Sequence, residues 1–231
     1  MKVEIAKTRR VARERMPRQD GDATRQHILE TAGPLYAERG YALVTSKEIC
    51  TRAGVNMASV NYHFGGKDGL YEAVLIEAHR QILSLEELER LAHAGDDPRA
   101  RLRAVLARLL AMSARPETSW GLKVILREMM MPSPLLPALV RRAILPKSQV
   151  VRELIRQIMG LPPDHPLVQR GMLFSMLPSF VLLLAPREVV GKLFPDPSTA
   201  APASLADDLT RFVLAGLEGM RGDPAQGDLA P

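Results

Sequence analysis

At 231 residues the chain is long enough to bury a sizeable core, as one large domain or as two smaller ones. Its single cysteine, Cys50, excludes an intramolecular disulfide and a cysteine-rich zinc cluster, and we expect it to be buried. The net charge of +5 is uneven, because residues 1–70 hold 12 Lys and Arg against 8 Asp and Glu, whereas residues 71–231 hold 19 against 18. The positive excess near the N-terminus favours a partner that carries phosphate groups.

The pattern of breaks and apolar residues is typical of an all-α protein. Proline and glycine clusters separate segments whose apolar residues recur at helical spacing, and the sequence has no convincing run of alternating β-branched residues. Residues 1–20 are charged and lack the apolar stretch of a signal peptide, so we expect a cytoplasmic protein.

The first segment, residues 1–21, is basic. It can be interpreted as a solvated tail or a translation-start artefact, or as a flexible arm that adds affinity for nucleic acid without sequence specificity. A first helix is predicted from Asp22 to Gly40. We expect a kink at Gly33–Pro34, because a proline inside a helix removes one backbone donor.

Residues 45–67, TSKEICTRAGVNMASVNYHFGGK, are predicted to form two short helices joined by a tight turn. Thr45 and Glu48 have the spacing of a capping box at the start of the first helix, and Gly54 is suited to end it. Asn56 is a good N-cap for the second helix. This pattern indicates a helix-turn-helix, whose second helix enters the major groove of DNA.

Beyond this motif the sequence predicts a larger helical region. The expected helices cover residues 67–93, 98–114, 119–131, 135–145, 147–159, 166–184, 187–194 and 204–220. The most apolar run, residues 171–185, falls short of the roughly 20 residues that a bilayer needs. We therefore expect a buried core or interface helix there, and no membrane partner.

Three stretches together resemble the N-terminal domain of TetR-type transcriptional repressors: LYAERGY, TSKEICTRAGV and NMASVNYHFGGKDGLY. The second of these joins the third directly, and REMMMPSP farther on resembles a subgroup with its own C-terminal domain. The resemblance implies a three-helix DNA-binding head on a larger helical domain that dimerises and holds an effector pocket. Together with the charge and break patterns, this predicts a basic arm over residues 1–21, a head over 22–69, a body over 70–222 and a flexible tail over 223–231.

The same resemblance implies which residues meet double-stranded operator DNA. They are Thr45, Ser46, Lys47, Asn56, Met57, Ala58, Ser59, Asn61, Tyr62, His63 and Lys67. The chain departs from the family where Asn61 replaces a common tyrosine, and where Met57 and Ala58 replace frequent polar residues. Apolar side chains at the start of the recognition helix favour contact with thymine methyl groups.

Two further sets of residues are weaker candidates. Methionine adapts to varied ligands, so an effector pocket is predicted near Trp120, Arg127, Met129 and Met176, although core packing or a solvated face also explains these residues. Two adjacent apolar helices from each subunit can form a four-helix dimer interface. The candidate interface residues are Met172, Phe180, Leu184, Leu209, Phe212, Val213 and Leu217.

The sequence favours a homodimeric repressor that an unknown small-molecule effector releases from a palindromic operator. The alternatives are a transcriptional activator and an effector-independent DNA-binding protein. An enzyme is disfavoured: residues 65–69, GGKDG, lack the spacing of a P-loop and follow no predicted strand, and no H-E-x-x-H pair is present. We expect no catalytic residue, no metal and no cofactor.

Overall fold

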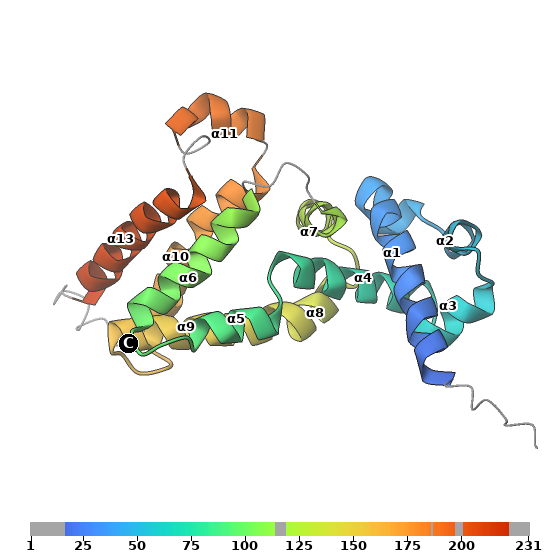
Figure 1. Cartoon of the computed structure of the whole chain (residues 1–231), viewed down its shortest axis with the longest axis horizontal. Coiled ribbons are helices and arrows are strands. Elements are labelled where there is room, and N and C mark those ends of the chain that lie inside the picture. The colour runs from blue at the N-terminus through green and yellow to red at the C-terminus, as the bar shows by residue number, and fades with distance from the viewer. Residues whose placement is uncertain (1–16, 114–118, 186, 197–200, 222–231) are drawn as a thin grey trace, which may run out of the picture.

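The computed structural model describes residues 17–113, 119–185, 187–196 and 201–221, and all regular structure in these ranges is helical. The all-α class is therefore confirmed. Three helices form a head at one end of the molecule, and the remaining helices form a larger body (Figure 1). Most of the predicted N-terminal arm and the tail from residue 222 lie outside the described residues. The head consists of α1 (Pro17–Leu43), α2 (Ser46–Ala53) and α3 (Met57–Phe64).

The first helix differs from the prediction at its start and agrees with it at Gly40. It begins at Pro17 rather than Asp22, and its backbone leaves helical geometry at Gly40, where φ is 76° and ψ is 174°. The dihedral angles at Gly33 and Pro34 stay helical, so the break lies one to two turns after the predicted kink. Pro34 is exposed, which lets solvent satisfy the carbonyl that loses its donor.

Local capping forms the helix-turn-helix as predicted. Thr45 Oγ1 accepts a hydrogen bond from Glu48 N at 3.3 Å, and Asn56 Oδ1 accepts one from Ser59 N at 2.9 Å. The capping box is incomplete, because the Glu48 carboxylate pairs with Arg39 of α1. That ion pair ties α2 to α1.

The helix predicted over residues 67–93 is in fact two helices, α4 (Lys67–Ile82) and α5 (Leu85–Ala92). Between them Leu83 is extended, with φ −159° and ψ 114°. Ser84 begins α5, since its Oγ accepts a hydrogen bond from Glu87 N at 3.1 Å. A local cap therefore overrides the continuous apolar spacing on which the prediction relied.

The predicted helix break at Pro146 is also wrong. The chain stays helical from residue 136 to residue 159, and Pro146 lies in the first turn of α9. A preceding π-helical stretch, η1, has wider turns that accommodate the missing backbone donor. The elements of this middle region are α6 (Pro98–Ser113), α7 (Trp120–Met130), α8 (Leu136–Leu139), η1 (Val140–Ile144) and α9 (Leu145–Met159).

The far end of the body holds α10 (Pro166–Leu184), α11 (Arg187–Leu193) and α13 (Pro202–Arg221). Helices α6, α10 and α13 pack against one another (Figure 1). By length and composition α10 is the one described helix that could cross a membrane, and only 33% of its apolar window is buried. The apolar run alone is too short to cross a bilayer, but the whole helix is long enough. Length therefore does not exclude a membrane span.

Helix α7 lies between the head and the body, packed against both α1 and α4 (Figure 1). Its Glu128 is buried and accepts a hydrogen bond from Tyr71 of α4 at 2.8 Å, and two more from Ser133 N and Oγ at 2.9 and 2.8 Å. Burial, and then the bond to Glu128, raise the pKa of Tyr71. These contacts make α7 a second connection between head and body, besides the covalent passage through α4.

Candidate DNA-binding surface and ligand cavity

The candidate recognition helix, α3, is held by one buried side chain and leaves most of its others in solvent. Val60 is fully buried, whereas Met57 is 42% and Tyr62 is 84% exposed. Arg25 of α1 lies over the Phe64 ring at 5.1 Å and helps to fix the end of α3. The other candidate residues of this face, Ala58 and Asn61 of α3 and Asn56 before it, are also exposed.

The N-terminal end of α2 presents a second group of predicted residues. Thr45 and Lys47 are exposed and line a shallow surface depression, which Glu48, Thr51 and Arg52 complete. Ser46 and Ser59 are half-buried. Lysine and hydroxyl groups at such a surface can donate to phosphate oxygens.

Two predicted DNA contacts already have partners inside the protein. Lys67 Nζ lies 4.5 Å from the centre of the Tyr41 ring, and Tyr41 donates a hydrogen bond to Asp68 at 2.6 Å. His63 is half-buried and lines a cleft between α1, α3 and α4, where it lies edge-on to Tyr62. Lys67 therefore has a partner within the protein that the sequence did not reveal, whereas His63 lies against its exposed neighbour Tyr62.

An apolar cavity of about 260 Å³ lies in the body, between α4, α5, α6, η1, α9 and α10. Of the predicted pocket residues, Met176 lines this cavity, and Met172, predicted at the dimer interface, also lines it. The rest of the wall includes Ile82, Leu88, Leu109 and Phe180. The three aliphatic positions carry no distinctive sequence signal, because they look like ordinary core residues, whereas Phe180 is a predicted interface residue.

The other three predicted pocket residues belong to α7 and lie elsewhere. A Cβ atom built at Gly33 of α1 would lie 2.5 Å from the Trp120 ring, so Trp120 packs directly on this glycine. Arg127 donates to the backbone carbonyls of Ala37 and Glu38, at 3.3 and 2.7 Å. Met129 is 60% exposed. Trp120 and Arg127 therefore fasten the head to the body and do not line the cavity.

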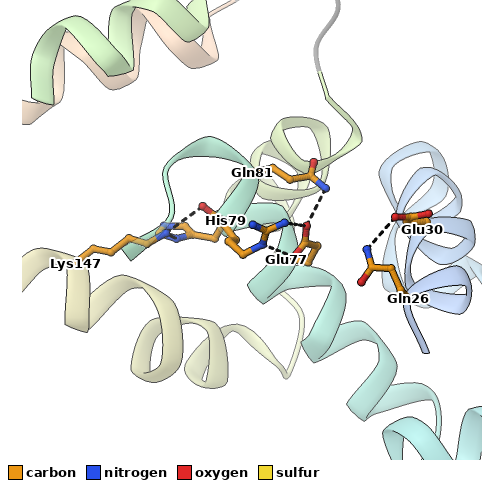
Figure 2. A network of polar contacts seen from close by, with 7 residues as sticks. Gln26, Glu30, Glu77, His79, Gln81 and Lys147 are labelled. Carbon is orange, nitrogen blue, oxygen red and sulfur yellow. Dashed lines mark hydrogen bonds and ion pairs between the residues drawn. The ribbon is translucent and has the colours of Figure 1, made fainter. Parts of the chain in front are cut away.

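The cavity has a polar end that the sequence did not indicate. Lys147 of α9 donates from Nζ to His79 Nδ1 at 2.7 Å and to the His79 carbonyl at 3.1 Å (Figure 2). Burial, and then the charge of Lys147, lower the pKa of His79 to about 4. Burial lowers the pKa of Lys147 to about 8, against an upward effect of Glu86. At neutral pH His79 is thus uncharged and Lys147 is mostly protonated.

The candidate interface residues differ in exposure. Phe180 and Phe212 are exposed, at 42% and 71%, while Val213 and Leu217 are buried within the protomer. The side chain of Leu184 lies outside the described residues. Met172 and Leu209 are half-buried. Residues that sequence reasoning missed lie on the same exposed face of α10 and are Leu173, Phe174, Leu177 and Val181.

Comparison with known proteins matches both parts of the chain. Residues 28–74 match the family model of bacterial regulatory proteins of the tetR family, and residues 98–217 match the model of the C-terminal domain of the HTH-type transcriptional dual regulator CecR. The chain is 32% identical over 103 residues to the HTH-type transcriptional regulator AcrR of Shigella flexneri, which covers 45% of this chain and 47% of AcrR.

Two further similarities are shorter or more distant. The HTH-type transcriptional regulator BetI of Burkholderia thailandensis is 40% identical over 70 residues, which is 30% of this chain and 35% of BetI. The alignments thus span about half or less of these curated relatives. The structure of FadR from Bacillus subtilis in complex with stearoyl-CoA superposes with a TM-score of 0.58 at 14% identity, covering 83% of this chain and 98% of that one.

Proposed function

Because the chain belongs to the TetR family of bacterial regulatory proteins, we propose that it is a homodimeric transcriptional repressor of a palindromic operator. A small-molecule effector that binds in the body releases the repressor. The observation that carries the proposal is α3, capped by Asn56, which rests on Val60 and turns Met57, Asn61 and Tyr62 to solvent. Such a helix can enter a major groove.

The base-facing start of α3 has little hydrogen-bonding capacity. Met57 and Ala58 can contact thymine methyl groups, whereas Lys47 at the start of α2 can donate to a base or a phosphate. Specificity would therefore depend on methyl contacts, on Lys47 and on the shape of the DNA. Asn61 and Tyr62 would contact the backbone and set the register of the head.

The dimer would form through the exposed apolar face of α10, together with the exposed Phe212 of α13. On α10 the exposed residues recur at helical spacing, so they form one stripe along the helix. Apolar patches of this kind mark interaction sites on soluble proteins. We propose a second copy of the chain as the occupant, and this arrangement would place two heads on successive half-sites.

The effector would occupy the cavity lined by Met176, which lies in the body and away from the head. The related fold of FadR was determined with stearoyl-CoA, so a body of this fold can hold a ligand with a long acyl chain. The contacts of α7 would transmit the conformational change that the effector causes from the body to the head. A coupling of about 1–3 kcal/mol is typical of such regulators and is enough to release a marginally bound operator.

Activation of transcription is a second candidate. It is supported by the match to the C-terminal domain of the HTH-type transcriptional dual regulator CecR. Transcription in vitro from the bound promoter separates the two, since an activator raises the yield of transcript and a repressor lowers it. In either case the proposal is a cytoplasmic regulator without cofactor or catalytic activity.

Gel shifts on the DNA upstream of the chain's own gene test DNA binding. We expect one fragment to bind at least about 100-fold more tightly than random DNA at roughly 150 mM salt. The double variant Met57→Asp, Tyr62→Asp should abolish this preference and keep its fold, because both side chains are exposed. Equal affinity for all fragments at this salt concentration would refute sequence-specific regulation.

A further inference from the structure

The wall of the cavity is apolar except at one end. Its three polar residues are His79, Lys147 and Ser148, and the Ser148 hydroxyl already donates to the Leu145 carbonyl at 2.8 Å. The volume of about 260 Å³ exceeds the roughly 150 Å³ apolar cavity that holds one benzene molecule. The cavity can therefore take an extended apolar group, with His79 and Lys147 beside one of its ends.

Lys147 and His79 offer more donors than the protein uses. An ammonium group has three N–H donors, and Lys147 directs two of them to His79 Nδ1 and to the His79 carbonyl. A neutral imidazole that accepts at Nδ1 carries its proton on Nε2. Within the described part of the chain, neither the third Lys147 N–H nor the His79 Nε2–H has a recorded acceptor. Two donors thus remain for a ligand.

The positive charge at this site is also left without a counter-ion. Glu86 of α5 acts on Lys147 from a distance, and no carboxylate of the described residues lies within 4.0 Å of its Nζ. The nearby Arg80 of α4 is neutralised by Glu77, with bonds of 2.7 and 2.8 Å. A half-buried cation beside an apolar cavity is stabilised when an anion pairs with it.

From this geometry we propose that the cavity binds an amphipathic acid, whose apolar chain fills the cavity and whose carboxylate accepts hydrogen bonds from Lys147 and His79. This inference rests on the proposed function only in naming the occupant as the effector. The carboxylate supplies the missing negative charge and the two missing acceptors. An uncharged or cationic analogue with the same chain supplies neither.

Lys147 could also be present for a structural reason, and the test must distinguish that role from ligand binding. Its bond to the His79 carbonyl lies in the last turn of α4, where a cation stabilises the helix C-terminus. A purely structural lysine would affect stability and would leave the choice between ligand head groups unchanged. Head-group selectivity is therefore the decisive measurement.

Isothermal titration calorimetry of the full chain without DNA, at about pH 7, compares decanoate, decanol and decylamine. We expect decanoate to bind about 10-fold more tightly than decanol, and decylamine to bind most weakly. Lys147→Met keeps the apolar stem and removes the charge, so it should abolish the preference and leave decanol affinity within about twofold. Lys147→Arg should retain the preference. Lys192→Met, at an exposed position on α11, is the matched control and should change nothing.

The preference should also fall as the pH rises. Above its pKa of about 8 Lys147 loses its charge, whereas His79 is already neutral and Arg80 and Glu86 keep theirs. Decanoate and decanol should therefore bind with similar affinity at about pH 10.5. Decanol binding as tightly as decanoate at neutral pH, or a preference that survives in Lys147→Met, would overturn the proposal.

Gel shifts with the same three compounds separate this inference from the proposed function. Selective binding of decanoate without release of DNA would leave the ligand class standing and refute release by the cavity ligand. Release of DNA by decanol at concentrations as low as those at which decanoate acts would leave release by the cavity ligand standing and refute the preference for an acid.

Discussion

Gly69 lies where the end of α3 meets the first turn of α4. A Cβ atom built there would lie 1.8 Å from the Phe64 carbonyl oxygen, which is far too close for two atoms that are not bonded to each other. Because the obstacle is backbone, it cannot be relieved by rotation of a side chain. Gly69→Ala is therefore expected to lower the free energy of unfolding by about 3 kcal/mol, measured by chemical denaturation.

Gly219 of α13 provides the control for this substitution, since a Cβ atom there would meet no heavy atom within 4 Å. Gly219→Ala should be neutral or should stabilise the protein by up to about 1 kcal/mol. Similar stabilities of the two variants would contradict the close approach at Gly69. The Gly69 variant should also lose DNA affinity, because the contact sets the position of α3.

Residues with local roles could be predicted from the sequence, and residues with distant partners could not. Thr45 and Asn56 cap helices through atoms three residues away, so the local sequence is sufficient. Trp120 packs on Gly33 and Lys147 contacts His79, 87 and 68 positions away along the chain. Nothing in the sequence near Trp120 distinguishes a helix contact from a ligand pocket, and the prediction chose the pocket.

At the scale of elements, α7 connects the head to the body. Arg127 donates to the Ala37 and Glu38 carbonyls, which lie just before the break in α1 at Gly40. Arg127→Gln shortens the side chain and removes its charge. We expect a loss of about 1–2 kcal/mol in stability, and amide exchange about 10-fold faster where α1 contacts α7.

The same variant tests whether α7 transmits the effector signal. Once an effector is known, its affinity for Arg127→Gln should stay unchanged, whereas the effector-induced drop in operator affinity should shrink. Lys123→Gln, at an exposed position on α7, is the control and should behave as the unmodified chain. Full release of DNA by the Arg127 variant would show that α4 alone is sufficient.

The helices themselves show where sequence reasoning stops. The break between α4 and α5 was readable in Ser84-x-x-Glu87, but the apolar residues continue at helical spacing across it and outweighed the cap. At Pro146 the reverse holds, because the local sequence predicts a helix stop and the proline instead lies in the first turn of α9. The exposed face of α10 required the three-dimensional structure, since an apolar helix can equally be a core helix.

At the scale of the whole molecule, that exposed face is the surface through which we propose that two copies pair. Phe174 and Val181 of α10 are 54% and 52% exposed, and neither lines the ligand cavity. If a second copy covers them, charged substitutions there would bury an unpaired carboxylate in the interface. The double variant Phe174→Asp, Val181→Asp should therefore be monomeric in sedimentation experiments. Its melting temperature should fall only by the amount that dimer formation contributes.

Loss of the dimer should also weaken operator binding by about 100-fold, since the second head then no longer benefits from being held beside its half-site. Met130→Asp is the control, because Met130 is an apolar residue of α7 that is 76% exposed, outside the proposed interface. It should stay dimeric and bind the operator normally. A dimer that survives in the α10 variant, or that dissociates in the Met130 variant, would move the interface from α10 to another face of the body.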